Sequence, residues 1–154
     1  MTIDDADLTP AEALAELLAV LVDAFAIDAE VAVVEDDGVL RGTIDGPGVD
    51  ALIGDSGSLI DAIQHIAQRV ALRGGEGLRV SVDADGYRQR RETELRSEAD
   101  RAAATAVAEQ RDVPLSPMPP AERRIVHEHL RDRGDVATHS EGDEPRRRLI
   151  VGPV

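Results

Sequence analysis

The order of apolar periods in the first half of the chain most constrains its fold. Thr9-Pro10-Ala11-Glu12 reads as a helix start, because Thr can cap a helix, Pro suits its first turn and Glu can complete a capping box. Leucines at helical spacing follow, as far as Phe25, and predict one stripe to bury. Asp36-Asp37-Gly38 then separates two apolar runs, 31–34 and 39–44, as a hairpin turn would. The pattern predicts a helix followed by a β-hairpin.

The next segments predict further helices and a third strand. A short helical piece ends at Ile53, and a longer helix runs from Ser58 to about Leu72. Its inner face is predicted to hold five apolar residues: Leu59, Ile63, Ile66, Ala67 and Val70. Leu78, Val80 and Val82 alternate with polar residues, as in a strand with one buried face. The first half is therefore predicted to be an α+β domain.

The second half is also predicted to combine helices with short strands. The longest predicted helix spans Tyr87 to about Glu109, and its small-residue face permits close packing: Leu95, Ala99, Ala102, Ala103 and Ala106. A short strand at 113–115 precedes a helix at 121–130, which Pro119-Pro120 opens. Two further strands, 136–140 and 147–151, are predicted to pair across a loop. This half is predicted to place helices on a small, mostly three-stranded sheet.

Charge divides the chain at the same place. Through Gly86 there are 18 acidic residues against four arginines, a net charge of −14, whereas the remainder has 13 acidic residues and 13 arginines. All 17 basic residues of the chain are arginine, whose planar fork matches a phosphate group. Because an acidic surface repels nucleic acid at long range, we expect the C-terminal half to lead any binding of nucleic acid.

Composition excludes several kinds of site. The chain has no cysteine and no His-x-x-x-His pair, so we expect no disulfide, no structural metal and no cofactor. Phe25 and Tyr87 are its only aromatic residues, which weakens any model that depends on stacking of bases. No apolar run approaches the length of a membrane span, and residues 1–9 form an acidic tail without a secretory signal. We expect a cytoplasmic protein with a flexible N-terminal tail and no stable membrane insertion.

Arg123 and His127 are the most suggestive pair in the chain. Four residues apart on a predicted helix, they share one face, and Arg124 lies beside them. Arginine supplies a permanent charge, and histidine donates from a ring nitrogen or becomes a partial cation below neutral pH. Such a pair can grip a phosphate, although a solvated helix face has the same spacing.

Four motifs carry a resemblance to a known family: Gly86-Tyr87-Arg88-x-Arg90-Arg91, Leu115-x-Pro117-Met118, Glu122-Arg123-Arg124-Ile125-Val126-His127 and Thr138-x-Ser140-Glu141-Gly142-x-Glu144-Pro145-x-Arg147-Arg148. Over residues 10–152 the chain resembles the Jag family, also called KhpB, of bacterial proteins. The resemblance implies a KH-like (type II) domain at 10–85 and an R-three-H domain at 86–154. It also implies a non-catalytic protein that binds single-stranded RNA in post-transcriptional regulation, with a small KH-domain protein as a candidate partner.

Gly54-Asp55-Ser56-Gly57 occupies the place of the Gly-x-x-Gly turn of a KH-like domain, between two predicted helices. The resemblance makes Gly54, Asp55, Ser56 and Gly57 candidate contacts to the RNA backbone. Asp55 departs from the pattern, since its carboxylate stands where a phosphate should lie. Gly-Asp-Ser-Gly also surrounds the nucleophile of chymotrypsin-like proteases, but this chain is too short for their double β-barrel. We therefore expect no enzyme that uses Ser56.

The dense basic run Arg146-Arg147-Arg148 lies at the start of the last predicted strand. On a strand, Arg146 and Arg148 would point to one side, while Arg147 would share its face with Leu149 and Val151. The resemblance gives Arg146 and Arg148 a role in binding phosphate. The alternative is an edge strand that its charge protects from aggregation.

A second function stays open from the sequence alone. The acidic first half, Asp55 and the shortage of aromatic residues all suit a protein-interaction adaptor with weak or no RNA binding. Salt-dependent binding to single-stranded RNA separates the two hypotheses.

Overall fold

The computed structural model describes residues 8–72 and 77–154. The chain forms two compact units, which we call unit 1, ending at Tyr87, and unit 2, beginning at Arg88. The first seven residues of the expected acidic tail lie outside the described residues. The mixed α+β class predicted from the sequence is confirmed, with helices on a three-stranded sheet in each unit.

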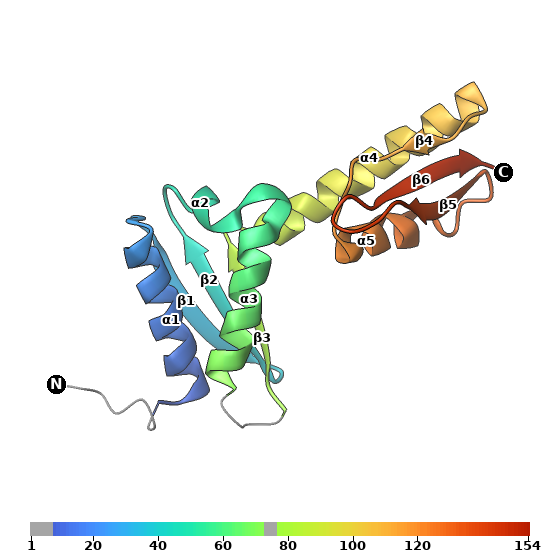
Figure 1. The fold of residues 1–154 in the computed structure, drawn as a ribbon. Helices are drawn as coiled ribbons and strands as arrows, with labels where there is room; N and C mark the ends of the chain where they lie inside the picture. Colours follow the sequence, from blue (N-terminus) through green and yellow to red (C-terminus); the bar gives the residue numbers. More distant parts are fainter. Residues whose placement is uncertain (1–7, 73–76) are drawn as a thin grey trace. The chain divides into compact units, whose positions relative to one another are not determined.

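Unit 1 builds its sheet from a hairpin and a crossover (Figure 1). Its elements are α1 (Pro10–Ala24), β1 (Glu30–Asp36), β2 (Val39–Asp45), α2 (Asp50–Ile53), the 3-10 turn η1 (Asp55–Gly57), α3 (Ser58–Ala71) and β3 (Arg79–Ala84). The strand order is β1-β2-β3; β1 and β2 are antiparallel, whereas β2 and β3 are parallel. A parallel pair needs a long crossover, which α2 and α3 supply. Both α1 and α3 cover one face of this sheet.

The start of α1 has the predicted capping box. The Thr9 hydroxyl accepts a hydrogen bond from the Glu12 N–H at 3.3 Å, and the Thr9 N–H donates to the Glu12 carboxylate at 2.9 Å. The Thr9 hydroxyl also donates to the Glu12 carboxylate at 2.7 Å, and this bond, together with the one from the Thr9 N–H, holds the pKa of Glu12 below its ordinary value. The local sequence signal was sufficient here because both partners lie within one helical turn.

The core of unit 1 is aliphatic, but the predicted burial was partly wrong. The inner face of α3 consists of Ile60, Ile63, Ala67 and Ala71, whereas Ile66 is 49% exposed. Two apolar stripes lie side by side on α3, and only the position of the sheet decides which one is covered. Phe25 is 44% exposed because it caps α1 just beyond the helix end and no longer continues its buried stripe.

Side chains of α3 also bind the outer edge of β3. The Val82 N–H donates to the side-chain Oε1 of Gln64 at 2.7 Å, and the Val80 N–H donates to the side-chain Oε1 of Gln68 at 3.1 Å. The Gln64 amide in turn donates to the Val80 carbonyl. Because β3 is an edge strand, these amides satisfy main-chain groups that would otherwise attract another strand. Neither glutamine was assigned a role from the residue pattern.

Unit 2 has an all-antiparallel sheet in the order β4-β6-β5. Its elements are α4 (Tyr87–Glu109, whose first residue belongs to unit 1), β4 (Val113–Pro114), α5 (Pro120–Leu130), β5 (Val136–Glu141) and β6 (Arg148–Pro153). The predicted small-residue face of α4 is confirmed, since all five of its residues are buried: Leu95, Ala99, Ala102, Ala103 and Ala106. They pack with Val126, Leu130, Leu149 and Val151 in one core.

A paired arginine and glutamate join α4 to α5 beside this core. The Arg91 Nε and Nη2 atoms donate to the two carboxylate oxygens of Glu122, each at 2.9 Å. Glu122 is only 9% exposed, and this two-point partner compensates the cost of burying the carboxylate. The pair fixes the first turn of α5, the helix that carries Arg123 and His127.

No helix within residues 8–72 and 77–154 has the length and apolar content that crossing a membrane requires.

Candidate nucleic-acid interface

A groove of about 370 Å³ lies between α5 and β5 in unit 2. The helix begins at Pro120, and its apolar side docks through Val126 and Leu130. This docking places the adjacent side of the helix at the groove, which is lined by Pro120, Arg123, Arg124, His127, Thr138, His139, Ser140 and Leu149. The structure therefore brings together Arg123, Arg124 and His127, three of the residues predicted from the sequence.

Arg123 is mostly committed to contacts within unit 2. The residue is 8% exposed, and its Nη1 donates to the Met118 carbonyl at 2.7 Å and to the Arg147 carbonyl at 3.4 Å. Its Nη2 forms an ion pair with the Glu144 carboxylate. Three of the five guanidinium N–H groups thus have protein acceptors. The arginine joins the start of α5 to the approach to β6, which residue spacing alone did not reveal.

His127 presents its ring at the groove. The side chain is exposed, and its Nδ1 lies 2.6 Å from the hydroxyl oxygen of Thr138 on β5. Within the described parts of the chain, its Nε2 makes no hydrogen bond. Thr138 entered the sequence analysis only as part of a family motif, and the spacing of the strand gave no sign that it would meet a helix residue.

Arg124 extends from the same turn toward solvent. Its side chain is 77% exposed and pairs with Glu128, one helical turn later, at 2.8 Å. The hydrogen bond between the two raises the pKa of Arg124 and lowers the pKa of Glu128. An exposed ion pair of this kind is weak, because water and salt screen it. A more strongly bound anion can therefore replace Glu128 as the partner of Arg124.

The basic run before β6 differs from its prediction. The strand begins at Arg148, so Arg146 and Arg147 do not alternate on it as expected. Arg146 lies in a turn, where its N–H donates to the Asp143 carbonyl at 2.9 Å, and its side chain is exposed. The side chain of Arg148 is half-buried and lies 3.8 Å from the Glu141 carboxylate. The loop ends later than the residue pattern indicated because the turn at Asp143 delays the pairing with β5.

The Gly54–Gly57 turn lies in unit 1, at the start of α3. Gly54, Ser56 and Gly57 have φ angles of 74°, 50° and 81°, a region that side chains rarely adopt. A Cβ atom on Gly57 would lie 2.8 Å from the Tyr87 ring, so only glycine fits there. Asp55 is exposed. Unlike the α5 groove, this turn presents a carboxylate and no basic side chain of its own.

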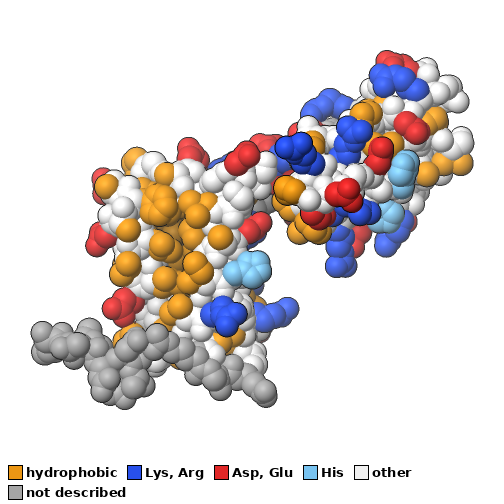
Figure 2. Space-filling view, viewed as in Figure 1, with side chains coloured by type: hydrophobic (Ala, Val, Ile, Leu, Met, Phe, Trp, Pro, Cys, Tyr) orange, Lys and Arg blue, Asp and Glu red, His pale blue; other side chains and the backbone are white. Residues whose placement is uncertain are grey.

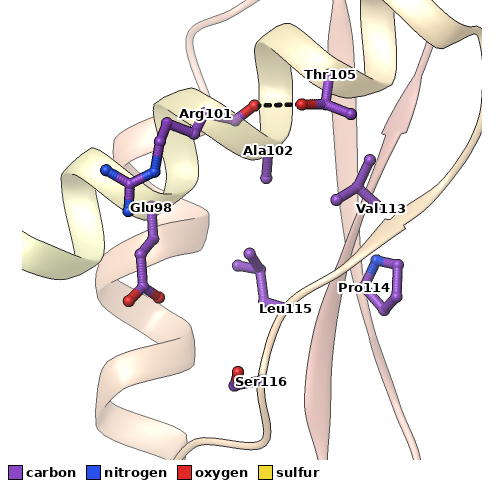
Figure 3. A pocket seen from close by; sticks show the side chains of 8 residues that line it. All are labelled: Glu98, Arg101, Ala102, Thr105, Val113, Pro114, Leu115 and Ser116. Atoms are coloured by element: carbon purple, nitrogen blue, oxygen red, sulfur yellow. Dashed lines mark hydrogen bonds between the residues drawn. The ribbon is translucent and has the colours of Figure 1, made fainter.

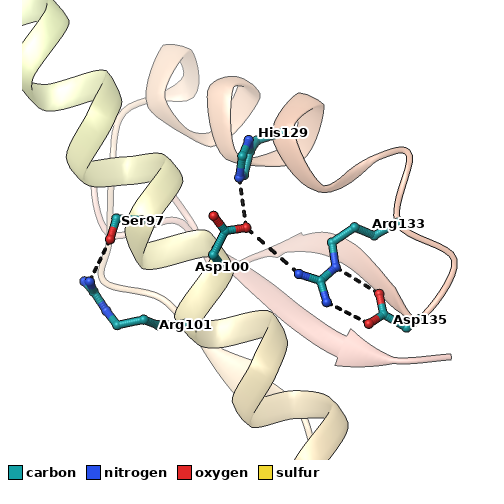
Figure 4. A network of polar contacts seen from close by, with 6 residues as sticks. All are labelled: Ser97, Asp100, Arg101, His129, Arg133 and Asp135. Carbon is teal, nitrogen blue, oxygen red and sulfur yellow. Dashed lines mark hydrogen bonds and ion pairs between the residues drawn. The ribbon is translucent and has the colours of Figure 1, made fainter.

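A network of polar contacts lies at the C-terminal end of α5 (Figure 4). The Asp100 carboxylate lies 3.0 Å from His129 Nε2 and 3.9 Å from Arg133, which forms two bonds to Asp135 at 2.9 and 2.7 Å. The Arg133 hydrogen bond lowers the pKa of Asp135, and Asp135 raises the pKa of Arg133. His129 is thus tied to α4. Across the described residues, no group of three or more His, Asp or Glu side chains is placed to hold a metal.

A second hollow, of about 390 Å³, lies between α4 and β4 (Figure 3). Its walls include the apolar Ala102, Val113 and Leu115, with Arg101 and Glu98 on the helix side. It contains none of the residues predicted as candidate contacts.

The arginines that Figure 2 shows over unit 2 are mixed with acidic side chains, whereas the same view of unit 1 shows a broad apolar surface.

Known proteins resemble this chain over much of its length. The family model of the R-three-H domain matches residues 93–153. The chain is 33% identical to RNA-binding protein KhpB of Clostridium symbiosum over 127 residues, which are 82% of this chain and 57% of that protein. It is 38% identical to KhpB of Lactiplantibacillus plantarum over 101 residues, 65% of this chain and 31% of the relative. For KhpB of Bacillus subtilis the identity is 30% over 137 residues, 87% of this chain and 66% of the relative.

The chain thus spans between about a third and two thirds of the length of these curated relatives. The matches to them extend well beyond the R-three-H region, since two of them cover more than four fifths of this chain. The sequence motifs, the α5 groove and these matches lead to one assignment: the chain belongs to the KhpB family, also called Jag, and has its R-three-H domain in unit 2.

Proposed function

We propose that this chain binds single-stranded RNA, as a binding protein rather than an enzyme, through the groove between α5 and β5. The observation that carries the proposal is the adjacent, outward placement of Arg124 and His127 beside this groove. The relatives' printed name, RNA-binding protein KhpB, supports it.

His127 and Arg124 would bind neighbouring oxygens of the RNA backbone. When the Thr138 hydroxyl donates to Nδ1, the ring proton lies on Nε2, which then points a donor at the phosphate. Arg124 would exchange Glu128 for the phosphate and bind it with its fork. Arg123 would hold α5 in place and offer its remaining N–H groups, and Arg146 and Arg148 would extend the basic surface along the β5–β6 loop.

Unit 1 would contribute less. Its order of helix, hairpin, two helices and strand, with β2 and β3 parallel, supports its assignment as a KH-like domain. Gly54, Ser56 and Gly57 would then approach the RNA with main-chain groups. Asp55 repels a phosphate at this turn, so we propose that the turn adds little affinity.

The test is fluorescence anisotropy of a labelled single-stranded oligouridine with the full chain, over a range of salt concentrations. Affinity should fall as salt rises, because phosphate contacts release counterions. His127→Ala should weaken binding roughly tenfold, the usual effect of losing one hydrogen bond to a charged group. His65→Ala is the matched control, since it removes an exposed histidine of unit 1. Absence of salt-dependent binding by the unaltered chain would refute the proposal.

A second candidate function is that of a protein-interaction adaptor. It is favoured by apolar side chains that unit 1 leaves exposed, among them Val20, Val34 and Ile66.

From the resemblance to the family we also propose a cytoplasmic location, a role in post-transcriptional regulation and a small KH-domain protein as partner. Co-purification of that partner after ribonuclease treatment, without crosslinked RNA, would favour the adaptor.

A further inference from the structure

Glu144 holds a position that an RNA phosphate could take. Its carboxylate forms an ion pair with Nη2 of Arg123, the arginine that also lines the α5 groove. The Arg123 side chain is 10% exposed, whereas the Glu144 side chain is 51% exposed. The pair thus joins an almost buried cation to an anion at the surface.

The three acceptors around Arg123 differ in whether they can leave. Two are main-chain carbonyls, of Met118 and Arg147, and Met118 is itself buried. They are fixed by the fold, and losing them would leave buried groups without partners. The third is the end of a flexible side chain in the exposed β5–β6 loop. Only Glu144 can move away without disturbing the core.

We propose that Glu144 is a built-in competitor for phosphate, whose carboxylate occupies the Arg123 edge that RNA takes when it binds. Carboxylate and phosphate oxygens both accept charge-assisted hydrogen bonds from a guanidinium, so either can pair with the Nη2 atom. Two anions at one guanidinium repel each other, so the arrival of RNA displaces Glu144. This inference rests on the proposed function and assigns the regulation of the same site.

The exchange explains how one arginine serves both the fold and the ligand. Nη1 keeps its two carbonyls throughout, while Nη2 changes partner from Glu144 to phosphate. Without RNA, the carboxylate keeps the nearly buried charge neutralised. When RNA binds, the cost of displacing Glu144 lowers the net affinity for RNA. Only an RNA segment that also contacts Arg124 and His127 therefore binds stably.

The experiment compares Glu144→Gln with Asp143→Asn in the full chain. The glutamine retains a carbonyl oxygen for Arg123 and loses the charge. Asp143 is the preceding exposed residue, and its side chain forms no ion pair within the described residues, so its substitution removes equal charge without touching Arg123. Labelled oligouridine should bind Glu144→Gln roughly five- to tenfold more tightly than the unaltered chain. Asp143→Asn should change affinity less than about twofold, because its effect is screened.

A second readout follows Glu144 directly. In the unaltered chain, saturating oligouridine should shift the carboxyl-carbon NMR resonance of Glu144 toward that of a solvated glutamate. A purely structural ion pair would leave that resonance unchanged. Melting temperatures of both variants confirm that the fold is retained.

Each outcome decides something. Equal affinities of Glu144→Gln and Asp143→Asn, with His127→Ala still weakened, would overturn the competitor and leave the proposed function standing. No binding by any variant would overturn both.

Discussion

The cores of the two units are built from different kinds of residue. In unit 1 the fully buried side chains are mostly leucine and isoleucine, and the buried residues include no charged side chain among those described. Unit 2 builds its longest helix face from alanines around one leucine and brings Glu122 and Arg123 inside. Alanine removes little apolar area from water, so fixed polar contacts must supply part of the stability of unit 2.

This contrast shows where fold and function can be separated. In unit 1, core substitutions should affect folding alone, because Gly54, Asp55 and Ser56, three of its four candidate contacts, are exposed. In unit 2, Arg123 belongs both to the core and to the groove, so its substitution mixes the two effects. A variant that loses RNA binding in unit 2 therefore means little until its stability has been measured.

The largest expected effect is a core truncation in unit 1. Ile60 has no exposed surface, and Ile60→Ala should lower the free energy of unfolding by about 3–4 kcal/mol, since the lost contacts leave a cavity. Denaturant unfolding followed by circular dichroism measures this. The RNA affinity of the folded protein should stay unchanged. A large loss of affinity would contradict the view that core substitutions in unit 1 affect folding and not RNA binding.

Arg123→Ala should come next, with a loss of about 3 kcal/mol, because it leaves the Met118 and Arg147 carbonyls without their donor. Amide hydrogen exchange measures the effect by unit: protection should fall in α5 and β6 and persist in α1 and α3. If Arg123 only gripped a phosphate, as the sequence pattern allows, the substitution would lower affinity in a protein of unchanged stability. An unchanged unfolding midpoint with weakened RNA binding would restore that simpler view.

Reversing charge at the turn of unit 1 should have a smaller effect of opposite sign. Asp55→Lys removes a repulsion and supplies a cation, so affinity for oligouridine should rise by about threefold, with a steeper dependence on salt. Asp50→Lys, an equal charge change on the preceding helix, is the control. Identical gains for both substitutions would mean that the whole unit, and not the turn, meets the RNA electrostatically.

The smallest effects concern acid stability, where each unit offers one carboxylate. Hydrogen bonds lower the pKa of Glu12 in unit 1 and of Asp135 in unit 2, so each contributes stability above its unfolded pKa that is lost as pH falls through its folded pKa. Glu12→Gln and Asp135→Asn should each flatten the decline of the melting temperature in acid. A flattening by only one of them would show which unit unfolds first.

Local patterns predicted much of unit 2 and most of unit 1. The bounds of α4 and the buried face of Leu95 and its alanines followed from helical spacing, and the capping box of α1 followed from Thr9 and Glu12. The face of α3 did not, because two apolar stripes competed and Ile66 belonged to the one left exposed. Spacing reports periodicity, and it does not report which side meets the sheet.

Residue order alone was enough for the α+β class, the division of charge between the halves, the family and the meeting of Arg123 and His127 on one helix. These depend on residues close together in the chain or on composition. The folded chain was needed to learn that Arg123 is nearly buried, that Thr138 meets His127 and that Glu144 pairs with one nitrogen of the guanidinium. Those partners lie 21 residues from Arg123 and 11 residues from His127 along the chain. No local period encodes such pairs, because they form only when the strands of unit 2 close against α5.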